Sequence, residues 1–183
     1  RDAAAASLAA VAIGTETNGS ITCPSSINGL VGLKPTVGLV SRTHVAPISS
    51  TQDTAGPMGR SVADVAAVLT AIAGSDPADK ATAEADAHRR DYVAALRPGA
   101  LQGARLGILK GDTGYLPAVD LLLDDAVAQL RAAGAEVIEI RDFTPAPAIG
   151  PDEGIILQTE LKATMNAYLA ATPDQRRALL ASE

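Results

Sequence analysis

The sequence has a single cysteine, Cys23, so no disulfide can form within the chain, and a reducing compartment is suitable. It has no apolar run near the roughly 20 residues that a membrane span requires. The alanine-rich start also lacks the basic, apolar and cleavage-site order of a signal peptide. We therefore expect a cytoplasmic protein that does not enter a membrane.

Positive charge is scarce as well. Fifteen Lys and Arg stand against 21 Asp and Glu, a net charge of -6, and the basic residues are scattered along the chain. Nucleic-acid binding needs a basic face, so no nucleic-acid partner is expected. Two distant histidines and one cysteine give no zinc spacing, and glycine-rich phosphate loops are absent from the sequence. We expect neither a metal nor a cofactor.

The composition that remains is that of a globular protein. Hydrophobic residues make up 47% of the chain and charged residues 20%, which is enough apolar surface for a core. The chain opens on Arg1 without a methionine and stops at Glu183 just after a helical stretch. We therefore expect residues 1–183 to be a single domain that is cut at both ends.

Helical and strand patterns alternate along the chain, which predicts an α/β fold without internal repeats. Good helix formers predict a helix over residues 3–11 that leads into a polar loop at Gly14. Residues 14–59 are rich in Gly, Pro, Ser, Thr and Asn with evenly spaced apolar anchors, which predicts packed loop structure. Ser61 and Asp64 form a capping box for a helix whose inward stripe comprises Val62, Val65, Ala66, Leu69, Ile72 and Ala73.

The second half of the chain predicts a βαβ unit at residues 104–140. Strands over 104–109 and 135–140 flank a helix over 117–133, so the two strands should be parallel with a right-handed crossover. The expected inward residues of this helix are Val119, Leu122, Leu123, Ala126, Val127 and Leu130. Residues 143–154 hold prolines and glycines and predict a loop, followed by a helix over 155–171.

One polar turn carries candidate chemistry. Ser20 follows Gly19 within residues 14–21 (GTETNGSI), where small residues let backbone N–H groups point at one spot. Amides grouped beside a hydroxyl suit acyl transfer, because they can stabilise the oxyanion that forms when the serine attacks a carbonyl. The alternative is a tight turn with a solvated serine.

Several motifs in order resemble the amidase signature family. GTETNGSI at 14–21 is followed by CPSS at 23–26, NGLVGLKPTVG at 28–38, SR at 41–42 and QDTAGPM at 52–58. The resemblance covers about residues 9–79 and is closest to stand-alone or peptide-amidase-like members. It implies part of a fold with a mixed central sheet flanked by helices.

The resemblance also implies roles for individual residues. Ser20 is then the nucleophile, and the backbone N–H groups of Thr17, Asn18, Gly19 and Ser20 form the oxyanion hole. Asp53 is expected to support the loop rather than react. The family's catalytic lysine and cis-serine are expected upstream of Arg1, so Ser20 is the one catalytic side chain within this sequence.

The activity implied is hydrolysis of a carboxamide C–N bond through a serine acyl-enzyme, on a small-molecule or peptide amide. The resemblance leaves open whether the protein forms a homodimer. One alternative is an amidotransferase subunit that passes ammonia to a tRNA-linked substrate. Another is a non-catalytic fragment or pseudoenzyme. The sequence departs from the family pattern at Thr22, where many members have arginine, and at Asn18, where many have Gly or Asp. The resemblance therefore does not identify the substrate.

Other reactive side chains have simpler interpretations. Lys34 lies in a GLKPT run that matches a family position other than the catalytic lysine. Cys23 is expected to be a small buried side chain. The sequence has no G-x-S-x-G elbow, so His44 and His88 are expected to be exposed or to support loops.

Overall fold

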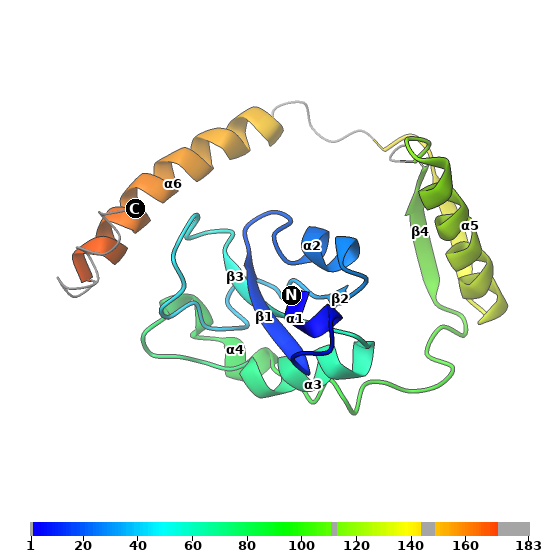
Figure 1. Cartoon of the computed structure of the whole chain (residues 1–183), viewed down its shortest axis with the longest axis horizontal. Helices are drawn as coiled ribbons and strands as arrows, with labels where there is room; N and C mark the ends of the chain where they lie inside the picture. Colours follow the sequence, from blue (N-terminus) through cyan, green and yellow to red (C-terminus); the bar gives the residue numbers. More distant parts are fainter. Residues whose placement is uncertain (1, 111–112, 144–148, 172–183) are drawn as a thin grey trace. The chain divides into compact units, whose positions relative to one another are not determined.

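The computed structural model describes residues 2–110, 113–143 and 149–171 (Figure 1). The chain falls into two compact units. The first unit comprises the chain up to Ala95 together with the part from Gly150 onward, and the second runs from Leu96 to Ile149. Among the described helices, none is both long and apolar enough to cross a bilayer.

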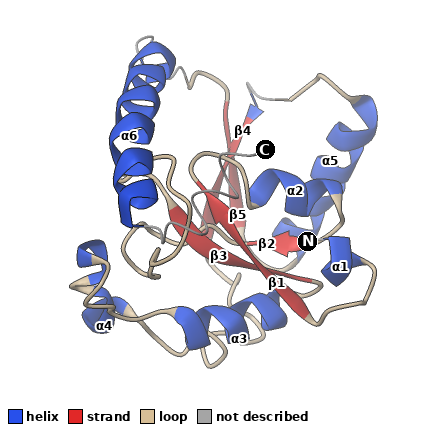
Figure 2. Ribbon diagram, turned by 60° about the vertical axis from the view of Figure 1, so that its left-hand side comes forward, coloured by secondary structure: helices blue, strands red, loops and turns tan. Residues whose placement is uncertain are grey.

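The first unit is built on a three-stranded antiparallel sheet (Figure 2). Its strands are β1 (Val11–Glu16), β2 (Val31–Gly32) and β3 (Thr54–Gly59), in the order β1-β3-β2. All six residues of the central strand β3 are buried. The prediction of loop structure for these segments is wrong, because pairing between them satisfies backbone groups that burial removes from water.

The start of the chain also differs from the prediction. Helix α1 covers only Asp2–Ala5, and the chain is in strand β1 from Val11 onward. Tertiary pairing therefore overrides helix propensity, since Val11 lies opposite Gly59 and Glu16 opposite Thr54 in the register with β3. A second short helix, α2 (Thr22–Ile27), begins two residues after Ser20, where a loop was expected.

Helix α3 (Val62–Ile72) is confirmed with its capping box. The Ser61 hydroxyl accepts from the Asp64 N–H at 3.1 Å, and the Asp64 carboxylate accepts from the Ser61 N–H at 3.1 Å. The predicted inward stripe is too wide, because Val62 is 56% exposed. The buried side chains of α3 are Val65, Ala66 and Leu69, and α3 packs on β3. A 3-10 turn (Lys80–Thr82) and helix α4 (Ala85–His88) follow.

The second unit is the predicted βαβ unit, with β4 (Arg105–Leu109), α5 (Pro117–Ala132) and β5 (Glu136–Ile140). Its strands are parallel, as expected, with Arg105 opposite Glu136. Val127 is buried and Leu123 and Leu130 are partly buried, whereas the other predicted inward residues, Val119, Leu122 and Ala126, are exposed. A sheet of two strands covers only a narrow stripe of the helix, which explains the difference.

The long helix α6 (Ile149–Ala171) confirms the predicted C-terminal helix but begins six residues earlier. The predicted loop is therefore wrong for residues 149–154, while residues 144–148 lie outside the described part. Pro151 is compatible with this start, because N–H groups in the first turn of a helix have no partner within the helix. With helices, an antiparallel sheet and a parallel sheet, the predicted α/β class is confirmed.

Gly56 in β3 is expected to tolerate no side chain. An added Cβ would collide with the Leu33 carbonyl oxygen and lie 2.8 Å from Pro35 Cδ and 2.9 Å from Ile21 Cδ1. Gly56→Ala should lower the free energy of unfolding by about 1–3 kcal/mol, measured as a lower melting temperature. Gly154→Ala is the control, because a Cβ there meets nothing within 4 Å in α6. Equal melting temperatures for the two variants would contradict the packing described.

Candidate active site

Residues 17–20, here called the serine loop, lie between the end of β1 and Ile21, the N-cap residue of α2. Thr17 is buried, whereas Asn18 and Ser20 are exposed. Gly19 has a φ of +135°, a backbone conformation that residues other than glycine rarely adopt. This explains why a glycine precedes Ser20. Ser20 lies at a pocket of about 680 Å³, lined by Asn18, Gly19, Ser20, Cys23, Pro24, Ile27 and Asn28.

The end of the serine loop is fixed by Glu16, a buried carboxylate at the end of β1. Its Oε2 accepts from the backbone N–H groups of Ile21 at 2.8 Å and Thr22 at 2.9 Å, and from the Thr22 hydroxyl at 3.3 Å. Burial alone raises the pKa of Glu16, but these bonds, with a further contribution from the Gly19 N–H, lower it below its ordinary value. Glu16 therefore stays ionised and holds the chain on both sides of Ser20.

The start of the serine loop is fixed by a second buried carboxylate, Asp53. Its Oδ1 accepts from the Thr17 hydroxyl at 2.6 Å. Its Oδ2 accepts from the backbone N–H groups of Ile48 and Ser49, both at 2.8 Å. Asp53 therefore joins the serine loop to residues 48–53, here called the support loop.

Glu16 is a site residue that the sequence reasoning missed. The available signal was an acidic residue just ahead of a polar turn and a helix start, where a carboxylate is stabilised by free backbone N–H groups. That signal depends on knowing that α2 begins at Thr22, and α2 was not predicted. Ser20, in contrast, was singled out by the sequence pattern as a serine in a polar turn, and the structure places it at a pocket.

The structure also sorts the other reactive residues. Cys23 is exposed and lines the pocket beside Ser20, so its predicted burial is wrong; in the first turns of α2 the buried residues are Pro24 and Ser25 instead. His44 and His88 are exposed, as expected, and neither they nor Lys34 lines this pocket. Within the described ranges, no group of three His, Cys, Asp or Glu side chains is placed to hold a metal ion.

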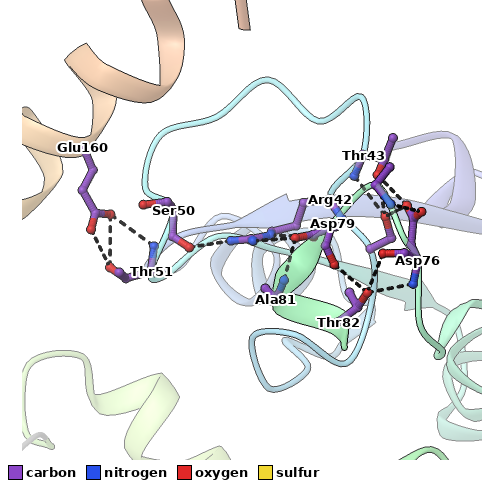
Figure 3. A network of polar contacts seen from close by, with 11 residues as sticks. Arg42, Thr43, Ser50, Thr51, Asp76, Asp79, Ala81, Thr82 and Glu160 are labelled. Atoms are coloured by element: carbon purple, nitrogen blue, oxygen red, sulfur yellow. Dashed lines mark hydrogen bonds and ion pairs between the residues drawn. The ribbon is translucent and has the colours of Figure 1, made fainter. Parts of the chain in front are cut away.

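The support loop has a further anchor in Arg42 (Figure 3). One guanidinium N–H donates to the Ser50 carbonyl oxygen at 2.6 Å. Two others donate to the Asp79 carboxylate, from Nε at 2.9 Å and from Nη2 at 2.8 Å. This bidentate ion pair fixes the guanidinium plane and, through it, the backbone at Ser50.

Asp79 is expected to make the stability of the fold depend on pH. The hydrogen bond from the Arg42 side chain lowers the pKa of Asp79 from 3.8 to about 2. A carboxyl group with a lowered pKa stabilises the folded state above its unfolded pKa, and this contribution is lost as pH falls through the folded pKa. Asp79→Asn should therefore cost about 2 kcal/mol at neutral pH.

The test for Asp79 is a pair of melting curves as a function of pH. The gap in melting temperature between the wild type and Asp79→Asn should be constant above about pH 5 and close between about pH 4 and pH 2. A gap that stays unchanged down to pH 2 would show that the Asp79 carboxylate is not stabilised by Arg42 in the way described.

The fold and the site together define a class of protein: an α/β protein with an exposed serine on a loop, at a pocket, with the loop held by two buried carboxylates. The sequence model of the amidase family matches residues 2–179. The chain belongs to the amidase family.

Individual relatives agree with this assignment. A probable amidase of Arabidopsis thaliana is 43% identical over 170 residues, which cover 90% of this chain and 32% of that protein. A glutamyl-tRNA(Gln) amidotransferase subunit of Rhodococcus erythropolis is 44% identical over 137 residues, covering 72% of this chain and 27% of that protein. The native peptide amidase of Stenotrophomonas maltophilia superposes with a TM-score of 0.82 and 51% identity, over 92% of this chain and 34% of that one. The chain thus spans about a third of these relatives.

Proposed function

We propose that the complete protein hydrolyses the C–N bond of a carboxamide, with Ser20 as the nucleophile. The observation that carries this proposal is the exposed Ser20 at a pocket, on a loop that Glu16 and Asp53 hold at both ends. A nucleophile must be held within a fraction of an ångström of its productive position, and two buried carboxylates are a means to do so.

The reaction would proceed in two steps. The Ser20 oxygen attacks the carbonyl carbon as its proton passes to a base, and the C–N bond then breaks so that ammonia or an amine leaves with that proton. Water then hydrolyses the ester and restores the Ser20 hydroxyl. By the family resemblance, the base is the lysine acting through the cis-serine, both expected upstream of Arg1.

The developing oxyanion would be held by backbone N–H groups of the serine loop, from Thr17, Asn18, Gly19 and Ser20. The positive φ of Gly19 supports a turn in which successive amides converge.

The substrate is proposed to be a small-molecule or peptide amide. The likeness to a peptide amidase of 51% identity supports this class. The run of residues 51–57 (TQDTAGP) resembles stand-alone amidases more than amidotransferase subunits. We also propose a cytoplasmic location, which suits the exposed thiol of Cys23.

A second candidate is a component of an amidotransferase complex, favoured by the likeness to the Rhodococcus erythropolis glutamyl-tRNA(Gln) amidotransferase. The two are separated by assaying the purified complete protein against peptide amides and small aliphatic and aromatic amides, with ammonia or amine release as the readout. Turnover without any partner is expected. If the protein releases nothing alone but supplies ammonia to a glutamyl-tRNA acceptor when other subunits are added, the amidotransferase assignment is correct instead.

A further inference from the structure

Within the first unit, helix α6 contacts two loops through two glutamates on one of its faces. Glu153 and Glu160 are seven residues apart, which is close to two helical turns, so they point the same way. Glu153 Oε1 accepts from the Asn18 side-chain amide at 3.1 Å. Glu160 Oε2 accepts from the Ser49 hydroxyl at 2.5 Å and from the Thr51 N–H at 3.2 Å. One helix therefore reaches both the serine loop and the support loop.

The Glu160 contact continues to the serine loop through hydrogen bonds alone. Ser49, whose hydroxyl donates to Glu160, also donates its N–H to Asp53 Oδ2 at 2.8 Å. Asp53 Oδ1 in turn accepts from the Thr17 hydroxyl at 2.6 Å. Ser49 is fully buried and Asp53 nearly so, which shields the middle of this chain from water.

Glu160 is well suited to order the support loop. Both of its carboxylate oxygens accept from the Thr51 hydroxyl, at 3.0 and 3.1 Å, and Oε2 also accepts from the Thr51 N–H (Figure 3). The bond from Ser49 adds to these. The hydrogen bond from Ser49 is the main cause that lowers the pKa of Glu160. The carboxylate therefore remains an acceptor at neutral pH and binds Ser49 and Thr51 of the support loop. Arg42 binds the same loop at the Ser50 carbonyl oxygen.

We propose that Glu160 is a positioning residue for Ser20, acting through Ser49, Asp53 and Thr17, and that Glu153 secures the same loop at Asn18. Helix α6 is then a brace that sets the geometry of the active site, although its sequence lies more than 100 residues from Ser20. This inference rests on the proposed role of Ser20 as nucleophile.

The Glu160→Ala variant of the complete protein tests whether Glu160 positions Ser20. Glu160→Gln is the conservative variant, and Gln158→Ala is the control. Gln158 is exposed on the same helix, so its truncation removes a side chain of similar length without touching either loop. We expect Glu160→Ala to lower kcat and the rate of fluorophosphonate labelling at Ser20 about tenfold with little change in KM. Glu160→Gln, which keeps one acceptor oxygen, should lie between this variant and the wild type, and Gln158→Ala should match the wild type.

A second readout does not require activity. Amide hydrogen exchange of the peptide that contains residues 17–20 should be faster in Glu160→Ala than in Gln158→Ala, since the brace is lost. A lower melting temperature with kcat, labelling and this exchange rate all unchanged would overturn the inference and leave Glu160 as a docking contact of α6. If the wild type neither turns over amides nor is labelled, the proposed function fails, and hydrogen exchange still decides whether Glu160 orders the serine loop.

Discussion

Replacing Ser20 with alanine is expected to lower kcat of the complete protein for its amide substrate by about 10⁴-fold or more. The hydroxyl is the atom that forms the acyl-enzyme in the proposed mechanism, and no neighbouring oxygen can replace it at the same position. If the substrate binds in the pocket, as the proposed function requires, its binding does not depend on this oxygen, so KM or the affinity for a product acid should change little. The measurement is steady-state kinetics on the variant and the wild type.

Ser26→Ala is the matched control for that experiment. Ser26 is an exposed serine in α2, six residues along the chain from Ser20, and it does not line the pocket. It should keep the wild-type kcat within about twofold, as surface substitutions do. If Ser20→Ala retained substantial turnover, or if both variants lost activity equally, the nucleophile would have to be sought elsewhere.

Glu16→Ala is expected to lower kcat by about 10²-fold and the free energy of unfolding by about 2–3 kcal/mol. The variant leaves the N–H groups of Ile21 and Thr22 without their carboxylate partner beside a buried site. The chain on the C-terminal side of Ser20 would then shift, and a displacement of about 1 Å at a catalytic group is enough for a loss of this size. Kinetics and melting curves measured on one preparation would report both effects.

Glu84→Ala is the control for Glu16→Ala, because its side chain is 88% exposed and its ion pair with His88 is long, at 4.0 Å. Removing an exposed acid should change neither kcat nor stability by a measurable amount. Wild-type kcat in Glu16→Ala would show that the serine loop keeps its geometry without this carboxylate.

The sequence was sufficient for the elements whose stability is local. The capping box of Ser61 and Asp64 and the alternation of strand, helix and strand over residues 104–140 each follow from residues close together in the chain. The polar turn that carries Ser20 was also readable, because Gly19 and Ser20 adjoin each other, and the structure shows Ser20 exposed.

The sheet that carries the site could not be predicted in this way. Strand β3 reads TAGPMG, with no alternation and with a proline, and it is a strand because β1 and β2 lie on either side of it. The Leu33 N–H donates to the Pro57 carbonyl oxygen at 3.1 Å, so Pro57 joins the ladder as an acceptor. Such pairing depends on partners roughly 40 residues away, which no local pattern reports.

The supports of the site were hidden for the same reason. Thr17 and Asp53 are 36 residues apart, and Ser49 and Glu160 are 111 residues apart, yet each pair is joined by one hydrogen bond. Local spacing gives no signal for a contact at that separation. The exposure of Cys23 likewise depends on which side of α2 faces the pocket, which only the folded chain defines.

The most direct test of the account is to treat the catalytically active complete protein with a fluorophosphonate and to map the adduct by mass spectrometry. We predict one stoichiometric adduct on the peptide that contains Ser20, loss of activity in step with its formation, and no adduct in Ser20→Ala. An active enzyme that is not labelled at Ser20, or a label that persists in Ser20→Ala, would contradict the assignment of Ser20 as the nucleophile.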